Sequence, residues 1–102
     1  MSLFVATVAD ADLPATACFS VHAQAEPGVM PRVLELFAKR GLVPCFYQSS
    51  TFGADGSHLS IEIRLHGLGR ETMDYIAASL RQIVSVQVVS AAHRHLPERA
   101  EY

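Results

Sequence analysis

Apolar and polar residues alternate along four segments of the 102-residue chain, and this period of two predicts four β-strands. The predicted strands span residues 15–24, 42–52, 58–65 and 84–91. The third alternates most cleanly, because its aliphatic residues from Leu59 to Leu65 are separated by single polar ones. Pro44 lies near the start of the second, which predicts an edge strand, since proline has no N–H for the ladder.

Two further segments repeat their apolar residues at helical spacing, which predicts amphipathic helices over residues 29–40 and 70–82. Val33 and Phe37 belong to the apolar stripe of the first helix. Gly41 is expected just past its end, where a left-handed residue commonly terminates a helix. Gly69 is expected to cap the start of the second helix.

The element order β-α-β-β-α-β predicts an α+β fold. Right-handed crossovers in its two β-α-β halves place both helices on one face of a four-stranded antiparallel sheet. This arrangement is the ferredoxin-like sandwich. The alternation predicts that the other sheet face carries Cys18, Ser20, His22, Ser60, Glu62, Arg64, Ser85 and Gln87. Such a face is either open to water or a docking surface for a partner or a second copy.

The predicted elements divide the chain into three parts. Residues 15–92 form the domain, residues 1–14 an N-terminal extension, and residues 93–102 a polar C-terminal tail. The extension is expected either to add an edge strand or to stay loose, and the tail is expected to be mobile.

Composition narrows the class of protein. With 50% hydrophobic residues, 18% charged residues and a formal net charge of −2, the chain is expected to fold rather than stay disordered. Its basic residues are scattered, which argues against a nucleic-acid partner. No apolar run approaches the ~18 residues of a membrane span, and the start lacks a signal peptide's basic region. Two cysteines give no disulfide framework, so we expect a small cytoplasmic protein.

Signatures of catalysis and of metal binding are missing from the sequence. No nucleophile elbow occurs, and Cys18 and Cys45 are too far apart for a metal loop. His93 and His95 offer only two ligands, which are too few for a metal site. The chain has no Asn, which small ferredoxin-like hydrolases of acyl phosphates use to position water. We therefore expect no catalytic residue, no metal and no cofactor, and a small enzyme on the same fold stays the alternative interpretation.

One loop, between the first strand and the first helix, is the candidate binding site. It consists of Ala25, Glu26, Pro27, Gly28, Val29 and Met30. Gly28 permits a close approach to the backbone, and the N–H groups that begin the helix suit a carboxylate. The alternative interpretation is a plain strand-to-helix turn, and the loop residues leave both open.

The run from Val21 to Gly41 resembles the first strand and helix of ACT domains. These domains typically run from a strand through an acidic or amide residue, Pro-Gly and an aliphatic residue into a helix ending in Arg-Gly. The later runs 60–63 and 80–86 resemble the small regulatory subunits of acetolactate synthase. The resemblance covers roughly residues 16–91.

The resemblance implies a non-catalytic regulatory domain that binds an amino-acid effector at its first loop and commonly pairs side by side, joining two sheets into one of eight strands. We expect either the outer face or the edge strands to mediate the pairing of a homodimer. In acetolactate synthase, an enzyme of branched-chain amino-acid biosynthesis, the small subunit supports a catalytic large subunit that itself carries the thiamine cofactor. Here Ala25 and Glu26 stand where effector loops usually carry Asp or Asn. We therefore expect a regulatory or assembly subunit of an acetolactate-synthase-like enzyme. The alternative is a free-standing homodimer that senses an amino acid or another small molecule.

Overall fold

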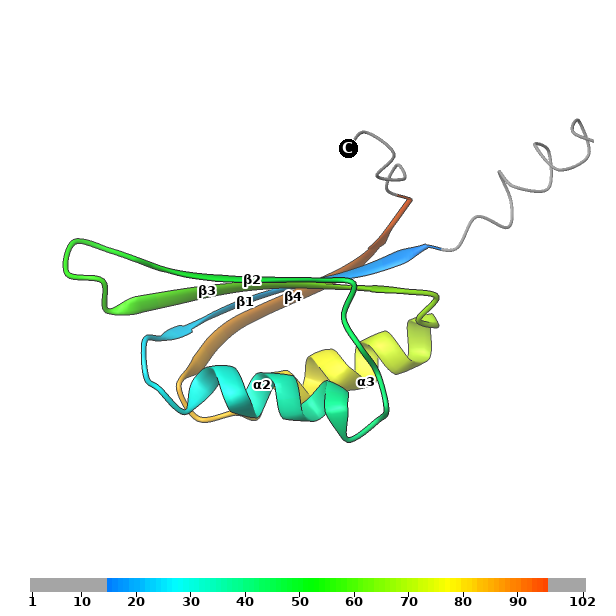
Figure 1. The fold of residues 1–102 in the computed structure, drawn as a ribbon, viewed down its shortest axis with the longest axis horizontal. Helices are drawn as coiled ribbons and strands as arrows, with labels where there is room; N and C mark the ends of the chain where they lie inside the picture. The colour runs from blue at the N-terminus through cyan, green and yellow to red at the C-terminus, as the bar shows by residue number, and fades with distance from the viewer. Residues whose placement is uncertain (1–14, 96–102) are drawn as a thin grey trace, which may run out of the picture.

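The computed structural model describes residues 15–95, which form a sheet with both helices packed on the same side (Figure 1). The elements are β1 Thr16–Gln24, α2 Val29–Ala38, β2 Phe46–Phe52, β3 His58–His66, α3 Arg70–Leu80 and β4 Val86–Arg94. The predicted order and the predicted ferredoxin-like sandwich are confirmed.

The sheet has the strand order β2-β3-β1-β4, and every neighbouring pair is antiparallel. β2 lies at one edge, as predicted, although Pro44, on which the prediction rests, precedes the strand. The strand begins at Phe46 rather than at residue 42, because residues 42–45 cross from the helix layer back to the sheet. The N–H of Cys45 donates to the carbonyl of Arg64 at 2.8 Å, which fixes the start of the ladder.

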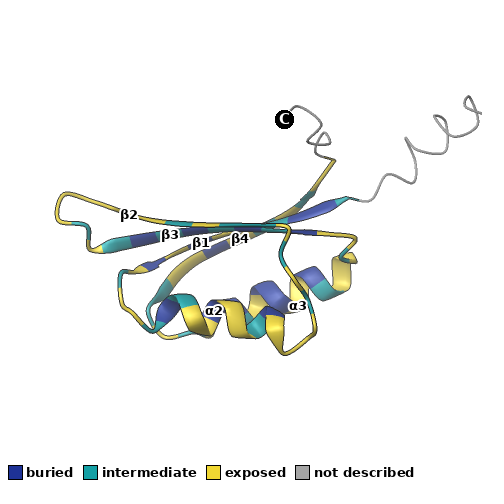
Figure 2. Cartoon of the chain, in the orientation of Figure 1, coloured by how far each residue is buried: buried dark blue, intermediate teal, exposed yellow. Residues whose placement is uncertain are grey.

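The core lies between the helices and the inner sheet face, where the buried residues of both layers meet (Figure 2). Phe19 of β1 and Phe37 of α2 pack edge to face, with ring centroids 5.5 Å apart. The other fully buried large side chains are Val21, Val29, Val33, Ile61, Ile63, Ile76 and Leu80. The aliphatic alternation of β3 and the helical stripes thus supply the core, as the sequence predicts.

Both helices end two residues earlier than predicted. α2 closes through a Schellman-type turn, in which the N–H of Leu42 donates to the carbonyl of Phe37 at 2.9 Å. Gly41 takes the left-handed conformation at this turn, with φ of +71°. Its predicted role as the terminating residue is therefore confirmed. Gly69 caps α3 in an extended conformation, also as predicted.

The predicted inward face of the last strand is confirmed at Val86, which packs against the core, and is wrong at Val84 and Val88. Val84 lies outside the strand and is 78% exposed. The pairing of β1 with β4 has a bulge, because His22 lies opposite Val88 but the next residue, Ala23, lies opposite Val86. This shift in register turns Val88 outward and Val89 inward. Val88 is accordingly 57% exposed and Val89 only 7%. Two adjacent valines fit either register by apolar pattern alone, so the sequence could not resolve the shift.

β4 continues to Arg94, two residues beyond the predicted end of the domain. Nε2 of His93 lies 2.7 Å from the carbonyl oxygen of Leu68, so this part of the expected tail is held against the domain. The expectations for residues 1–14, including the added edge strand, lie outside the described residues, as do those for residues 96–102.

Candidate functional site

The candidate loop is held by backbone hydrogen bonds to two other connections at the same end of the sheet. The N–H of Ala25 donates to the carbonyl of Ser57 in the β2–β3 hairpin at 2.9 Å. The N–H of Gln24 donates to the carbonyl of Ser85, which precedes β4, also at 2.9 Å. The three connections therefore lie at the same end of the sheet (Figure 1).

Half of the six predicted loop residues pack inward. Val29 is fully buried and belongs to the core, and Ala25 and Met30 are partly buried against it. The hydroxyl of Ser49 on β2 donates to the sulfur of Met30 at 3.3 Å. Their side chains anchor the loop, which leaves Glu26, Pro27 and Gly28 as the residues open to a ligand.

Gly28 has an ordinary helical conformation, with φ of −79°, so its backbone does not require glycine. The space beside Gly28 is occupied, because a Cβ atom there would lie 2.6 Å from Nη1 of Arg32. The guanidinium of Arg32 thus folds back over the start of α2. Arg32 is not among the predicted site residues, although its position four after Gly28 places the two on one helix face.

The first turn of α2 offers few donors to an anion. The N–H of Val29 donates to the carbonyl of Glu26 at 3.1 Å, and Pro31 has no N–H. The N–H of Arg32 closes a helical turn onto Gly28. At this helix start, only the N–H groups of Gly28 and Met30 have no backbone acceptor within residues 15–95, so fewer donors than expected are free for an anion.

Glu26 is engaged by a residue far along the chain. The hydroxyl of Ser85 donates to Oε1 of Glu26 at 2.6 Å. Ser85 was predicted on the outer sheet face, which is wrong, because it lies in the turn before β4 with φ of +82°. No local signal marks this conformation, since left-handed positions usually carry Gly, Asn or Asp.

The uncovered sheet face gathers most of the residues predicted for it. Cys18, Ser20 and His22 of β1 lie opposite Arg64, Glu62 and Ser60 of β3, in that order. Gln87 was also predicted on this face, but it lies at the bulge and has no pairing partner on β1.

An aromatic cluster, which was not predicted from the sequence, lies at one end of this face. The ring of Phe52 stacks on His58 at 5.2 Å and approaches His22 at 5.5 Å. Val88 lies directly opposite His22 on β4. Phe52 is 43% exposed, so the cluster presents apolar surface to its surroundings. The period of two along β2 could have predicted the place of its phenylalanines, because Phe46 and Phe52 are six residues apart and therefore lie on the same sheet face.

The other end of the face carries charge and a thiol. The guanidinium of Arg64 lies 4.4 Å from the ring centroid of Phe46 and 3.4 Å from Oε2 of Glu62. Burial raises the pKa of the Cys18 thiol, and the positive charge of Arg64 partly opposes this rise. Residues 15–95 contain no cluster of three metal-ligating side chains, and no described helix is long and apolar enough to cross a membrane.

Comparisons with known proteins agree with this fold. A family model described as an ACT-like domain matches residues 10–98. The ACT domain of GTP pyrophosphokinase from Chlorobium tepidum has a TM-score of 0.64 at 10% identity, over 78% of this chain and 99% of that one. The C-terminal domain of the MgtC protein from Mycobacterium tuberculosis has a TM-score of 0.65 at 11% identity, over 86% and 96%. An uncharacterized protein from Thermotoga maritima has a TM-score of 0.62 at 14% identity, over 78% and 96%. No curated protein matches the sequence.

Proposed function

The chain belongs to the family of ACT-like domains, which are regulatory small-molecule-binding modules, and from this premise we propose that it is a non-catalytic assembly subunit. In this proposal its uncovered sheet face docks against a second copy of the chain. The observation that carries the proposal is the exposed cluster of Phe52 and Val88 beside His22 on that face.

Small side chains beside the cluster support close packing of two such faces. Ser20 lies opposite Ser90, and Cys18 lies opposite Ala92, so the middle of the face has no bulky side chain on these strands. Two sheets stack at ~10 Å when their side chains interdigitate. A flat strip of small residues next to a projecting aromatic ring suits that geometry.

The charges on the face also suit a two-fold pair. Arg64 and Glu62 lie two residues apart on β3, and both are half-buried. A two-fold interface brings the same patch of each copy together, so the Arg64 of one copy can meet the Glu62 of the other. The face is therefore able to complement itself without another partner.

The state of the loop favours assembly over sensing. The carboxylate of Glu26 is engaged by Ser85, and the guanidinium of Arg32 covers Gly28. A ligand at this loop has to displace contacts that the chain already makes with itself. An assembly role needs no such displacement.

Sedimentation equilibrium of two matched valine variants tests the docking proposal. Val88→Thr places a hydroxyl in the proposed interface of both copies, which should weaken dimerisation about tenfold. Val84→Thr changes an exposed valine outside the strand and should leave the dissociation constant unchanged. Equal dissociation constants for the two variants contradict the proposal.

We further propose that the assembled chain binds a second kind of partner, a catalytic large subunit like that of acetolactate synthase. It is supported by the sequence similarity of the runs 60–63 and 80–86 to small regulatory subunits. Mixing the chain with a thiamine-dependent catalytic subunit should raise its turnover, and the two should co-elute. Unchanged turnover and separate elution remove this partner but leave self-association intact.

A second candidate function is the sensing of a small molecule, which requires that the guanidinium of Arg32 leave its place over Gly28 and turn to the ligand. An anionic ligand group could pair with this cation at the helix start. An amino acid present at 100 times its dissociation constant should stabilise the fold by about 2.7 kcal/mol. Thermal denaturation against a panel of amino acids measures this, and an unchanged melting temperature across the panel excludes the candidate.

A further inference from the structure

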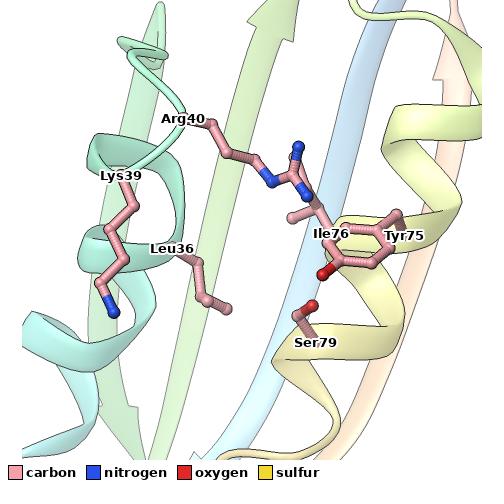
Figure 3. A pocket seen from close by; sticks show the side chains of 6 residues that line it. All are labelled: Leu36, Lys39, Arg40, Tyr75, Ile76 and Ser79. Atoms are coloured by element: carbon pink, nitrogen blue, oxygen red, sulfur yellow. The ribbon is translucent and has the colours of Figure 1, made fainter.

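A cavity of about 240 Å³ opens between the two helices, on the side of the molecule away from the uncovered sheet face (Figure 3). It is lined by Leu36, Lys39, Arg40, Tyr75, Ile76 and Ser79. The side chains come from the end of α2, from the two residues that follow it, and from the middle and end of α3. Neither the candidate loop nor the proposed docking face contributes to it.

Arg40 crosses the cavity toward α3 because of the turn that ends α2. Gly41 adopts its left-handed conformation directly after Arg40, where the chain leaves the helix. The guanidinium carbon of Arg40 lies 4.3 Å from the ring centroid of Tyr75, a cation–π contact that holds the planar group in place (Figure 3). The edges of the guanidinium remain available, since the ring contacts only one of its faces.

The cavity carries an unbalanced positive charge. The ion pairs of residues 15–95 join Lys39 to Glu35, Arg64 to Glu62, and Arg70 to Asp74. Arg40 therefore has no carboxylate partner in the described part of the chain. The Lys39 pair is long, at 3.6 Å, and both of its side chains are exposed, so it screens the neighbouring charge only weakly.

The floor of the cavity is apolar. Ile76 is buried, and Leu36 is partly buried against the core. Ser79 adds a hydroxyl beside them. An apolar floor under a few convergent polar groups is the usual composition of a small-molecule site.

We propose that this cavity binds a small carboxylate whose apolar part is flat or branched and which carries no amino group. The carboxylate pairs with the fork of Arg40, and the apolar part lies on Leu36 and Ile76. An ammonium group has no carboxylate partner among the lining residues, and Glu35, the acidic residue nearest in the helix, is engaged by Lys39. The volume lies below the range of about 300–1,000 Å³ that holds drug-sized ligands, so the occupant is small.

Titration of the ¹⁵N-labelled chain with three probes tests the site. Benzoate should shift the amide signals of residues 36–41 and 75–80. Benzamide has the same shape without the charge, and inorganic phosphate has charge without an apolar part, so both should bind at least tenfold more weakly. No shift of these amides at about 10 mM benzoate, tenfold above a millimolar Kd, overturns the proposal.

Variants separate the site from general surface binding. Arg40→Gln should weaken benzoate binding about tenfold, because it removes the charge-assisted hydrogen bonds. Tyr75→Ala should weaken it as well, since the guanidinium loses its support. Arg70→Gln removes an exposed arginine of the same helix layer outside the cavity and should leave binding unchanged. Equal loss in Arg40→Gln and Arg70→Gln, or equal binding of benzoate and benzamide, contradicts the site.

Discussion

The hydroxyl of Ser85 and the carboxylate of Glu26, 59 residues apart in the chain, are joined by a hydrogen bond of 2.6 Å. The bond links the turn before β4 to the loop before α2. Ser85 holds it from a left-handed conformation, with φ of +82°, which costs a non-glycine residue free energy. The contact therefore combines a favourable hydrogen bond with local backbone strain.

Substitutions of Ser85 separate these two contributions. Ser85→Ala loses the hydrogen bond and keeps the strain, so it should lower the free energy of unfolding by about 1 kcal/mol. Ser85→Gly also loses the bond but relieves the strain, and should be about 1 kcal/mol more stable than Ser85→Ala. Urea denaturation measures both, and a less stable Ser85→Gly contradicts the strain. A double-mutant cycle with Glu26→Ala should give a coupling of at least about 0.5 kcal/mol.

Two glycines with open space around them test the end of α2. A Cβ atom at Gly41 or at Gly69 meets nothing within 4 Å, so sterics do not distinguish them. Only Gly41 has a positive φ, and Gly41→Ala should lower the free energy of unfolding by about 1 kcal/mol. Gly69→Ala loses a preferred cap residue but also reduces the conformational freedom of the unfolded chain, so its net cost should be at most a few tenths of a kcal/mol. Equal costs in chemical denaturation contradict the strained turn.

The sequence predicts the regular parts of this fold well, because side-chain period and element order carry them. The alternation of β3 and the stripe through Val33 and Phe37 set the core directly. The inward face of β4 was not predictable, because the bulge beside His22 shifts the register between two adjacent valines. Because of that shift, Val88 lies on the uncovered sheet face instead of in the core.

The β3 core supplies a matched test of packing. Ile63 is fully buried, and Ile63→Val should lower the free energy of unfolding by about 1 kcal/mol through the lost methylene and the space left behind. Val43→Ala removes apolar atoms from a residue that is 85% exposed and should change stability by less than about 0.5 kcal/mol. Thermal or urea unfolding compares them, and a cost at Val43 equal to that at Ile63 contradicts the assigned core.

The Cys18 thiol should be alkylated more slowly than an unburied thiol at a given pH. Because burial raises the pKa of Cys18, less thiolate is present at a given pH, so its alkylation should require more alkaline solution than that of a free thiol. The pH profile is measured by mass spectrometry in Cys45→Ser, where Cys18 reacts alone. Arg64→Gln removes a charge that lowers this pKa and should move the profile further alkaline. A profile that moves toward acid contradicts the electrostatic assignment.

The candidate site was less predictable than the fold. The sequence indicated the loop, but the contacts that occupy it come from elsewhere. Arg32 covers Gly28 through the turn of the helix, and Ser85 reaches Glu26 through the meeting of two connections. The cavity beneath Arg40 depends on the spacing of the two helices, which no single segment encodes. Tertiary placement therefore decides the chemistry that is open to a ligand.

The central claim is that two copies meet through the uncovered sheet face. Isotope-filtered NMR on a mixture of labelled and unlabelled chains detects contacts between copies directly. Cross-peaks between copies from the Val88 methyl groups and the Phe52 ring are the predicted result. Contacts confined to the edges of β2 and β4 or to the helices, or no contacts at concentrations of about 1 mM where even a millimolar Kd gives dimer, contradict the account.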